Sequence, residues 1–514
     1  MKKYDIFELT LQGPTDGNPF TEVDLRAKFS FMNYKRIVSG FYDGDGVYKI
    51  RFMPDREGEW SYTTISNSGE LDGKEGSFVC DPAIPGNHGP VRVMSKFHFA
   101  YDDGTPYYPY GTTAYNWTNQ EPSLVAQTIE TLKTSSFNKV RYSPFPKYYL
   151  YNTNEPQLYP YEGGLASGVK DASKVSMPGF FSGKPSEAYK FDFSRPNPKF
   201  WHQFEECVFT LDDLGIETDL ILFHPYDRWG FSQMTREENL LYMRYIVARL
   251  GAVKSIWWSM ANEFDLFFNR NEEDWEIYAR ALEEWDAAQH LRSIHNCRDP
   301  YDYSKSWITH VSIQRIDYHS HVELTHKWRE KWQKPVVVDE ICYEGNIESG
   351  FGNLPGEELT KRFWDVVVRG GYCTHGETYL RDDEILWWSK GGWLNGSSPK
   401  RIAFLRKLNE RIGPIDPSPV MEWDLPWGLS GKQFKYETKS PFSPFSVAAD
   451  KMLCYFSFAQ PAVRTFNLPV DVPYEVEIID TWEMTITKLN GKFSGPSRIS
   501  LPGKQYIAVL FTKL

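Results

Sequence analysis

Two apolar runs of the chain each end in a glutamate. The run 255–261 leads into Asn262-Glu263, and the run 335–338 leads into Asp339-Glu340. A buried parallel strand reads as a continuous apolar segment, and a carboxylate at its end faces whatever pocket lies there. A lone Asn-Glu is more typical of a strand followed by a solvated acidic loop. Two such glutamates in one chain, however, are what hydrolysis of a glycosidic bond requires.

The two carboxyl groups would need different protonation states. In a retaining glycosidase one carboxylate attacks the anomeric carbon while the other protonates the leaving oxygen, and the two lie about 5–5.5 Å apart. At that separation the ionised group raises the pKa of its neighbour. We assign Glu340 as nucleophile and Glu263 as acid/base, with Asn262 placed to bind the sugar 2-hydroxyl. Strand alternation puts Val336, Val338 and Glu340 on one face, which we expect to point inward.

The segment 93–415 has the pattern that would position these residues, because short strands alternate with amphipathic helices. Strands are predicted at 107–115, 138–142, 217–224, from 255, and at 292–296, 307–314, 336–340 and 371–377. Helices are predicted at 123–136, 198–214, 236–250, 272–289, 321–332, 359–369 and 399–411. Eight such units predict an α/β fold, the (β/α)8 TIM barrel. A doubly wound sheet is the alternative, but no Gly-rich phosphate loop follows any strand.

Small β domains are predicted on both sides of the barrel. Residues 1–92 have the turns and alternating strands of an immunoglobulin-like β-sandwich, and residues 416–514 are again rich in strands after the Pro-rich linker 414–419. Asp43 and Asp45 belong to a turn and lack the spacing of a calcium loop. The Pro/Gly/Tyr-rich stretch 145–192 is too long for an ordinary connection and indicates a functional loop or an insertion.

Polar residues collect at the predicted strand ends, where active sites of TIM barrels lie. We expect the substrate to contact Arg141, Asn262, His224, Gln314, His375, Glu377 and Trp387. The alternative for the Trp387-Trp388 pair is packing under the last helix, and Glu377 is a rival for the role of nucleophile. An aromatic content of 16% suits both sugar stacking and β-rich cores.

Charge and composition exclude several classes of partner. The net charge is −11 and no long basic run exists, so no nucleic acid is expected. No apolar stretch of membrane-spanning length is present, and Asp5 and Glu8 interrupt any signal-peptide core. Six scattered cysteines without a C-x-x-C pair predict a cytoplasmic protein with free thiols. No cofactor and no metal are expected, and the oligomeric state stays open.

The pair Asn262-Glu263 with Glu340 resembles the clan A glycoside hydrolases around family 5. That resemblance implies a retaining mechanism with Glu263 as acid/base, Glu340 as nucleophile, Asn262 as the sugar-binding residue and Arg141 as the strand-two arginine. The stretch 258–265 is similar to the apiosidase-like barrels, the pattern 41–62 resembles domain family 5060, and the C-terminal part resembles domain family 5605. The clan often has His-x-Tyr on strand six, which this chain lacks, so the residue that orients Glu340 stays open.

Two other classes of function compete with the glycosidase. A non-catalytic carbohydrate-binding protein on the same barrel would bind sugar without turnover, but would need no acid/base pair. A metal-dependent hydrolase would use His224, Asp227, His295 and His375 as ligands, although no H-x-H pair ends strand one.

Overall fold

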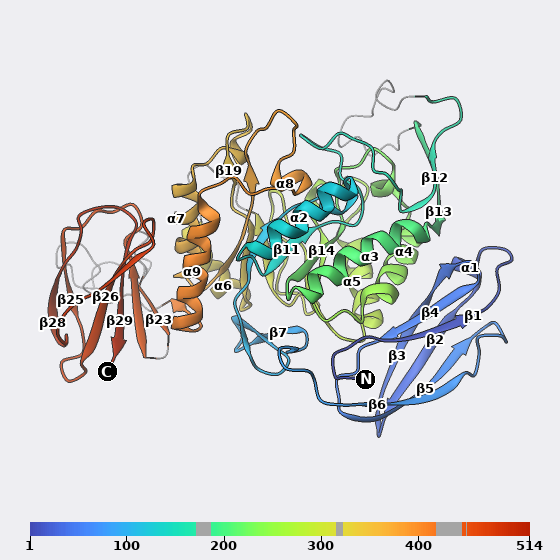
Figure 1. Ribbon diagram of the computed structural model, residues 1–514, viewed down its shortest axis with the longest axis horizontal. Coiled ribbons are helices and arrows are strands. Elements are labelled where there is room, and N and C mark those ends of the chain that lie inside the picture. The colour runs from blue at the N-terminus through green and yellow to red at the C-terminus, as the bar shows by residue number, and fades with distance from the viewer. Residues whose placement is uncertain (171–186, 315–321, 418–444, 449) are drawn as a thin grey trace.

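The computed structural model describes residues 1–170, 187–314, 322–417, 445–448 and 450–514. A central barrel carries one β domain at each side, formed by the two ends of the chain (Figure 1). Within the described residues, no helix is long and apolar enough to cross a membrane.

The barrel is made of eight parallel strands in the order β16-β15-β14-β11-β10-β20-β18-β17. A parallel bridge between His295 and Ser312 joins the two end strands, so the sheet closes. The fold is therefore the predicted (β/α)8 barrel. In chain order the strands are β10 (Tyr110–Thr113), β11 (Lys139–Tyr142), β14 (Glu217–Phe223), β15 (Ile256–Ala261), β16 (Leu291–Ser293), β17 (Val311–Gln314), β18 (Val336–Glu340) and β20 (Tyr372–His375).

In the described part of the barrel, the helices around these strands are α2 (Pro122–Thr134), α3 (Pro198–Asp213), α4 (Arg236–Leu250), α5 (Glu272–Trp285), α6 (Thr325–Trp332), α7 (Gly356–Val367) and α9 (Ser398–Ile412). Helix α4 has the predicted bounds, and a capping box between Thr235 and Glu238 fixes its start. Helix α5 ends before the predicted 289, because Asp286 leaves the helix to bind Trp258 and His290. The predicted start of α6 at residue 321 lies outside the described residues.

The predicted first strand, 107–115, is two strands in the structure. Its start forms β9 (Pro106–Tyr107), which joins β7 (Val91–Met94) and β8 (His98–Tyr101) in a small antiparallel sheet. Pro109 separates it from β10, since proline cannot donate a ladder hydrogen bond. The long loop 145–192 contributes β12 (Tyr161–Leu165), which pairs with β13 (Tyr189–Pro196), and its residues 171–186 lie outside the described residues.

The N-terminal domain is a β-sandwich built from β1 (Phe7–Gln12), β2 (Leu25–Phe31), β3 (Tyr34–Gly44), β4 (Val47–Phe52), β5 (Gly58–Ser66) and β6 (Glu75–Cys80). The first half of β3 pairs with β2 and its second half with β4, so one long strand serves both layers. Phe29 stacks on Phe52 at 4.2 Å in the core between them. A short helix, α1 (Pro19–Glu22), connects β1 to β2.

A buried ionic cluster joins this domain to the barrel. Arg249 of α4 donates to Glu205 of α3 at 2.7 Å and to Asp43 of β3 at 2.8 Å, and Arg51 of β4 donates to the same Glu205 at 2.6 Å. Asp43 thus serves an interdomain contact as well as the turn that follows it.

The C-terminal β domain packs on α7 and α9 (Figure 1). Its larger sheet contains β22 (Asp416–Pro417), β23 (Phe445–Ala448), β24 (Lys451–Tyr455), β29 (Ile507–Lys513), β26 (Tyr474–Asp480) and β27 (Thr485–Lys488), and β25 (Val463–Asn467) pairs with β28 (Pro496–Ser500). The contact with the barrel includes Trp364 against Tyr455 at 5.2 Å and the Arg401 guanidinium 3.4 Å from the Trp482 ring centre.

Candidate active site

Glu263 lies directly after β15, at the carboxyl end of the barrel. Its backbone has φ of 52°, a left-handed conformation that few residues other than glycine adopt and that occurs preferentially at functional sites. The side chain is 5% exposed, and the Tyr226 hydroxyl donates a hydrogen bond to its Oε2. The turn after strand four therefore fixes this carboxyl group in the mouth of the barrel.

Glu340 is the last residue of β18, and its side chain contacts residues that follow two other strands. The hydroxyl of Tyr115, which follows strand one, donates to Glu340 Oε1. His295, which follows strand five, has its Nε2 3.3 Å from the same oxygen. These two residues orient Glu340, which answers the point that the sequence left open. Gln314 of strand six in turn contacts His295, because its Oε1 lies 3.2 Å from His295 Nε2.

A β-bulge brings Glu340 into the site. Asp339 contacts Lys139, Ser312 and Thr374 of three other strands at 2.6–2.8 Å inside the barrel. By alternation Val337 shares the inward face with Asp339, so the expectation that Val336 and Val338 point inward with Glu340 was wrong. The ladder with β17 shifts its register between Ile313 and Gln314, opposite Asp339-Glu340. Such a bulge re-aims one side chain, here that of Glu340.

The pKa values of the two glutamates move in opposite directions. Burial raises the pKa of Glu263, and the negative charge of Glu340 raises it further. Burial opposes ionisation of Glu340 as well, but the contacts with His295 and Tyr115 outweigh it and lower the pKa to about 2. Of the two carboxyl groups, Glu263 thus holds its proton more readily and Glu340 ionises more readily.

Lys147 is a site residue that sequence reasoning missed. Its Nζ lies 3.5 Å from the ring centre of Tyr115 and 4.2 Å from that of Tyr226, the two tyrosines that bind the glutamates. Burial lowers the pKa of Lys147 to about 8, and the charges of Glu263 and Glu340 offset only part of this effect. A lysine in a Pro/Tyr-rich loop has no spacing that marks it, so only the fold reveals it.

Arg141 and Asn262 come together as predicted. Arg141 is fully buried, and it donates to Asn262 Oδ1 at 3.1 Å, to Ser259 at 3.0 Å and to Asp219 at 3.3 Å. The Tyr115 hydroxyl also reaches Asn262 Oδ1, at 3.4 Å. Arg141 therefore positions Asn262 from beneath the site.

Other predicted residues lie near the centre or line it. His224 follows β14, and burial together with the Lys147 charge lowers its pKa to about 3, so it is neutral. The predicted ligand Asp227 instead accepts backbone hydrogen bonds from its own loop, including Ser232. Trp388 forms an aromatic wall with Tyr115 at 5.9 Å and Tyr149 at 5.8 Å between ring centres.

Three residues predicted to bind substrate lie elsewhere. The neighbour of His375 on β20, Thr374, faces Asp339 inside the barrel, so His375 points outward, where its ring stacks on Phe137 at 4.8 Å. Trp387, at the start of α8 (Trp387–Lys390), donates to Thr112 at 2.7 Å and is packed as the alternative interpretation held. Glu377 of β21 (Glu377–Thr378) accepts from the backbone of Asn395 and Gly396. For His375, its position at a strand end did not settle which of the two faces its side chain occupies.

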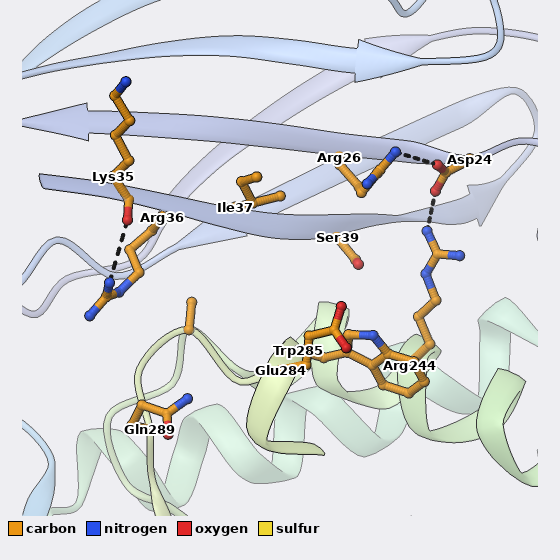
Figure 2. A pocket seen from close by; sticks show the side chains of 11 residues that line it. Asp24, Arg26, Lys35, Arg36, Ile37, Ser39, Arg244, Glu284, Trp285 and Gln289 are labelled. Atoms are coloured by element: carbon orange, nitrogen blue, oxygen red, sulfur yellow. Dashed lines mark hydrogen bonds and ion pairs between the residues drawn. The ribbon is translucent and has the colours of Figure 1, made fainter. Parts of the chain in front are cut away.

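A second hollow, of about 780 Å³, lies between the N-terminal sheet and helices α4 and α5 (Figure 2). Asp24 bridges Arg26 and Arg244 across it, and Trp285 lines its floor. The hollow lacks a pair of buried carboxylates, so it offers no second centre for the same chemistry.

A closed barrel with two buried glutamates at the ends of strands four and seven defines a glycoside hydrolase. Comparison with protein families agrees: residues 96–403 match the family described as "Apiosidase-like, catalytic domain". The domains of unknown function DUF5060 and DUF5605 match residues 1–67 and 441–512. Because the catalytic-domain match spans more than half of the sequence, the chain belongs to the apiosidase-like family.

Solved structures show the same architecture. A candidate glycoside hydrolase from Bacteroides vulgatus ATCC 8482 is 36% identical with a TM-score of 0.89, covering 100% of this chain and 99% of that one. A glycoside hydrolase family 5 structure from the same organism is 14% identical with a TM-score of 0.61, over 84% of this chain and 94% of that one, and supports the fold alone. A search of the curated proteins found no match.

Proposed function

We propose that this glycoside hydrolase retains anomeric configuration and cleaves O-glycosidic bonds in oligosaccharides or polysaccharides by double displacement. One observation carries the proposal: the tyrosines that bind Glu340 and Glu263 both face Lys147, and the pKa values of the two glutamates are displaced in opposite directions. An acid and a nucleophile need that division of protonation states.

In the first step Glu340 attacks the anomeric carbon, and the glycosidic bond breaks as Glu263 gives its proton to the leaving oxygen. This step forms a glycosyl ester on Glu340 and leaves Glu263 ionised. In the second step Glu263 removes a proton from water, whose oxygen attacks the anomeric carbon and releases Glu340. The net reaction adds one water molecule across the bond and restores both carboxyl groups.

The surroundings of each glutamate support its role. Glu340 accepts from Tyr115 and contacts His295, and both interactions favour the carboxylate form of a nucleophile. Burial favours the protonated form of Glu263, and it outweighs the hydrogen bond from the Tyr226 hydroxyl, which favours the carboxylate. Asn262 has its Oδ1 held by Arg141, so its Nδ2 is the end available to a sugar hydroxyl. The wall around Trp388 supplies apolar faces for a sugar ring.

Trapping the covalent intermediate tests the proposal. A panel of activated 2-fluoro glycosides, with apiosides included because of the family's description, is incubated with the protein and the product is digested for mass spectrometry. We expect one sugar per chain on the peptide that contains Glu340. The Glu340→Gln variant should take no label, and in Glu377→Gln any label should still lie on the peptide that contains Glu340.

Label on Glu377, or full glycosidase activity in Glu340→Gln, would overturn the assignment. A non-catalytic carbohydrate-binding protein would bind sugars in calorimetry, yet release no aglycone from any chromogenic glycoside of the panel.

We also propose a cytoplasmic location, where the substrates would be short oligosaccharides. The six cysteines form no disulfide with one another, and five of them are buried, as suits a reducing compartment. Fractionation of the source cells checks this, and recovery of the protein outside the cytoplasm would refute it.

A further inference from the structure

A second cluster of ionisable side chains lies outside the barrel wall, beside the aromatic wall of the candidate active site. Its members are Glu344 of β19 (Glu344–Gly345), His375 at the end of β20, and Glu377 of β21. Strands β19 and β21 pair in parallel, with Glu344 opposite Glu377. One ring nitrogen of His375 and one oxygen from each carboxylate lie within 4.8 Å of one another.

The cluster is buried and its negative charge is not balanced. Both carboxylates are 1% exposed or less. Glu344 accepts from Ser397 N at 2.7 Å and Ser398 N at 2.9 Å, and Glu377 accepts from Gly396 N at 2.8 Å. These donors are all neutral, and among the residues that the structure describes neither carboxylate forms an ion pair.

Other buried carboxylates of the same barrel are paired with cations. Beneath the candidate active site, the buried carboxylates of Asp219 and Asp339 are matched by the cations of Lys139 and Arg141. A buried charge without a partner is strongly destabilising, because the desolvation of the ion is not offset. The buried pair Glu344 and Glu377 therefore calls for a cation within its own cluster.

His375 supplies an independent sign of a ligand. The side chain is fully buried, and its Nδ1 lies 3.0 Å from the Thr112 hydroxyl oxygen. Its Nε2 has no hydrogen-bond partner among the described residues, although it is buried. A metal-bound histidine commonly has its second ring nitrogen held by an oxygen in this way. With Nδ1 held by Thr112, Nε2 is the ring nitrogen available to a ligand.

We propose that Glu344, His375 and Glu377 bind one divalent transition-metal ion of the zinc or manganese type. An imidazole nitrogen with two carboxylate oxygens suits these ions, whereas Mg²⁺ and Ca²⁺ prefer sites made of oxygen ligands alone. The ion's two positive charges neutralise the two carboxylates. This assignment departs from the sequence-based expectation of no metal, and it also differs from the metal-dependent hydrolase alternative, whose ligands were His375 with His224, Asp227 and His295.

The geometry needs little rearrangement. Ligand atoms about 2.1 Å from a tetrahedral ion lie about 3.4 Å apart, so binding draws the three groups inward by about 1 Å. The Oε2 atoms of Glu344 and Glu377 each accept one backbone hydrogen bond, so each of these oxygens keeps a lone pair for the ion. Water completes the coordination.

The ion would brace the wall of the candidate active site rather than act on substrate. It ties β19 and β21 to the 395–398 turn, which begins α9. Tyr343, next to Glu344, packs on Trp388 with ring centres 6.1 Å apart. Metal loss is therefore expected to loosen the loops after strands seven and eight.

The test measures metal content and affinity directly on the full chain. The protein is stripped with a chelator, dialysed, and titrated separately with Zn²⁺, Mn²⁺ and Co²⁺ under calorimetry. We expect one ion per chain, a rise in melting temperature on metal addition, and visible Co²⁺ absorption bands typical of mixed nitrogen and oxygen ligands. Glu377→Gln and His375→Gln should each weaken affinity at least tenfold.

Two controls keep the test decisive. His88→Gln removes an exposed histidine paired with Asp103 and should leave stoichiometry and affinity unchanged. Should His375→Gln fail to fold, the nearly isosteric Glu377→Gln and the wild-type titration still decide the matter. Equal affinity in wild type and Glu377→Gln, or no metal-dependent rise in melting temperature, would overturn the proposal. A carboxyl pair that shares a proton instead would show the second of these results.

Discussion

Asp339 and Glu340 are consecutive residues of one strand, yet both side chains reach the interior side of the barrel. Asp339 contacts Lys139 within the barrel, and Glu340 meets Tyr115 and His295 at its mouth. The register shift opposite Gln314 makes this possible. The bulge thereby stacks an ionised support layer directly below the proposed nucleophile, where the positive charges of Lys139 and Arg141 hold the pKa of Asp339 well below its usual range.

Removing the proposed acid should slow the reaction without removing the nucleophile. Glu263→Gln is expected to lower kcat/KM by about 10²–10⁴-fold on substrates whose leaving group needs a proton. Substrates with a nitrophenolate leaving group should keep more of their rate in the first step. Added azide should restore turnover and give a glycosyl azide of retained configuration, measured by chromatography and NMR. An azide product of inverted configuration would refute double displacement.

Tyr115→Phe should shift the acid limb of the pH–rate profile. The hydroxyl stabilises the carboxylate of Glu340, and losing a hydrogen bond to a charged group costs about 1.5–3 kcal/mol, or about one to two pKa units. The pKa of Glu340 should rise, so protonation inactivates the variant at a higher pH than wild type. Profiles of kcat/KM from pH 3 to 9 measure this shift. An unmoved acid limb would show that Tyr115 does not tune Glu340.

Lys147→Met should shift the opposite limb. The ammonium group favours the ionised form of Glu263, so its removal raises the pKa of Glu263 further. The acid then stays protonated to higher pH, and the basic limb of kcat/KM moves upward while the maximal rate falls. Lys390→Met, at a half-buried lysine outside the described contacts of the two glutamates, is the control and should leave both limbs in place. A basic limb that moves downward would contradict the proposed protonation states.

The interdomain cluster predicts a stability effect. Arg249→Met leaves Glu205 with Arg51 alone and removes one partner of Asp43, so we expect a loss of about 3–5 kcal/mol. Arg244→Met breaks a half-exposed ion pair with Asp24 and should cost less than about 1 kcal/mol. Urea unfolding followed by tryptophan fluorescence compares the two variants. An equal loss of unfolding free energy in the two variants would show that burial does not strengthen the ion pairs of Arg249.

The sequence by itself predicted the barrel, and it predicted that Glu263 and Glu340 lie at the ends of its fourth and seventh strands. Alternation of apolar runs with helical periodicity is a local property, and it placed α4 and β18 at their observed bounds. Asn262 and Arg141 also followed from their positions at strand ends, and the structure joins them by a hydrogen bond.

Only the tertiary structure decided which face each strand-end residue occupies. His375 lies at a strand end as predicted, but its ring stacks on Phe137 outside the barrel, and Trp387 lies in α8 and packs against Thr112. The same limit hid Lys147, whose place between Tyr115 and Tyr226 depends on the path of a loop. The direction of a side chain and the charges around it depend on contacts between residues far apart in sequence. A local sequence pattern does not reveal these contacts.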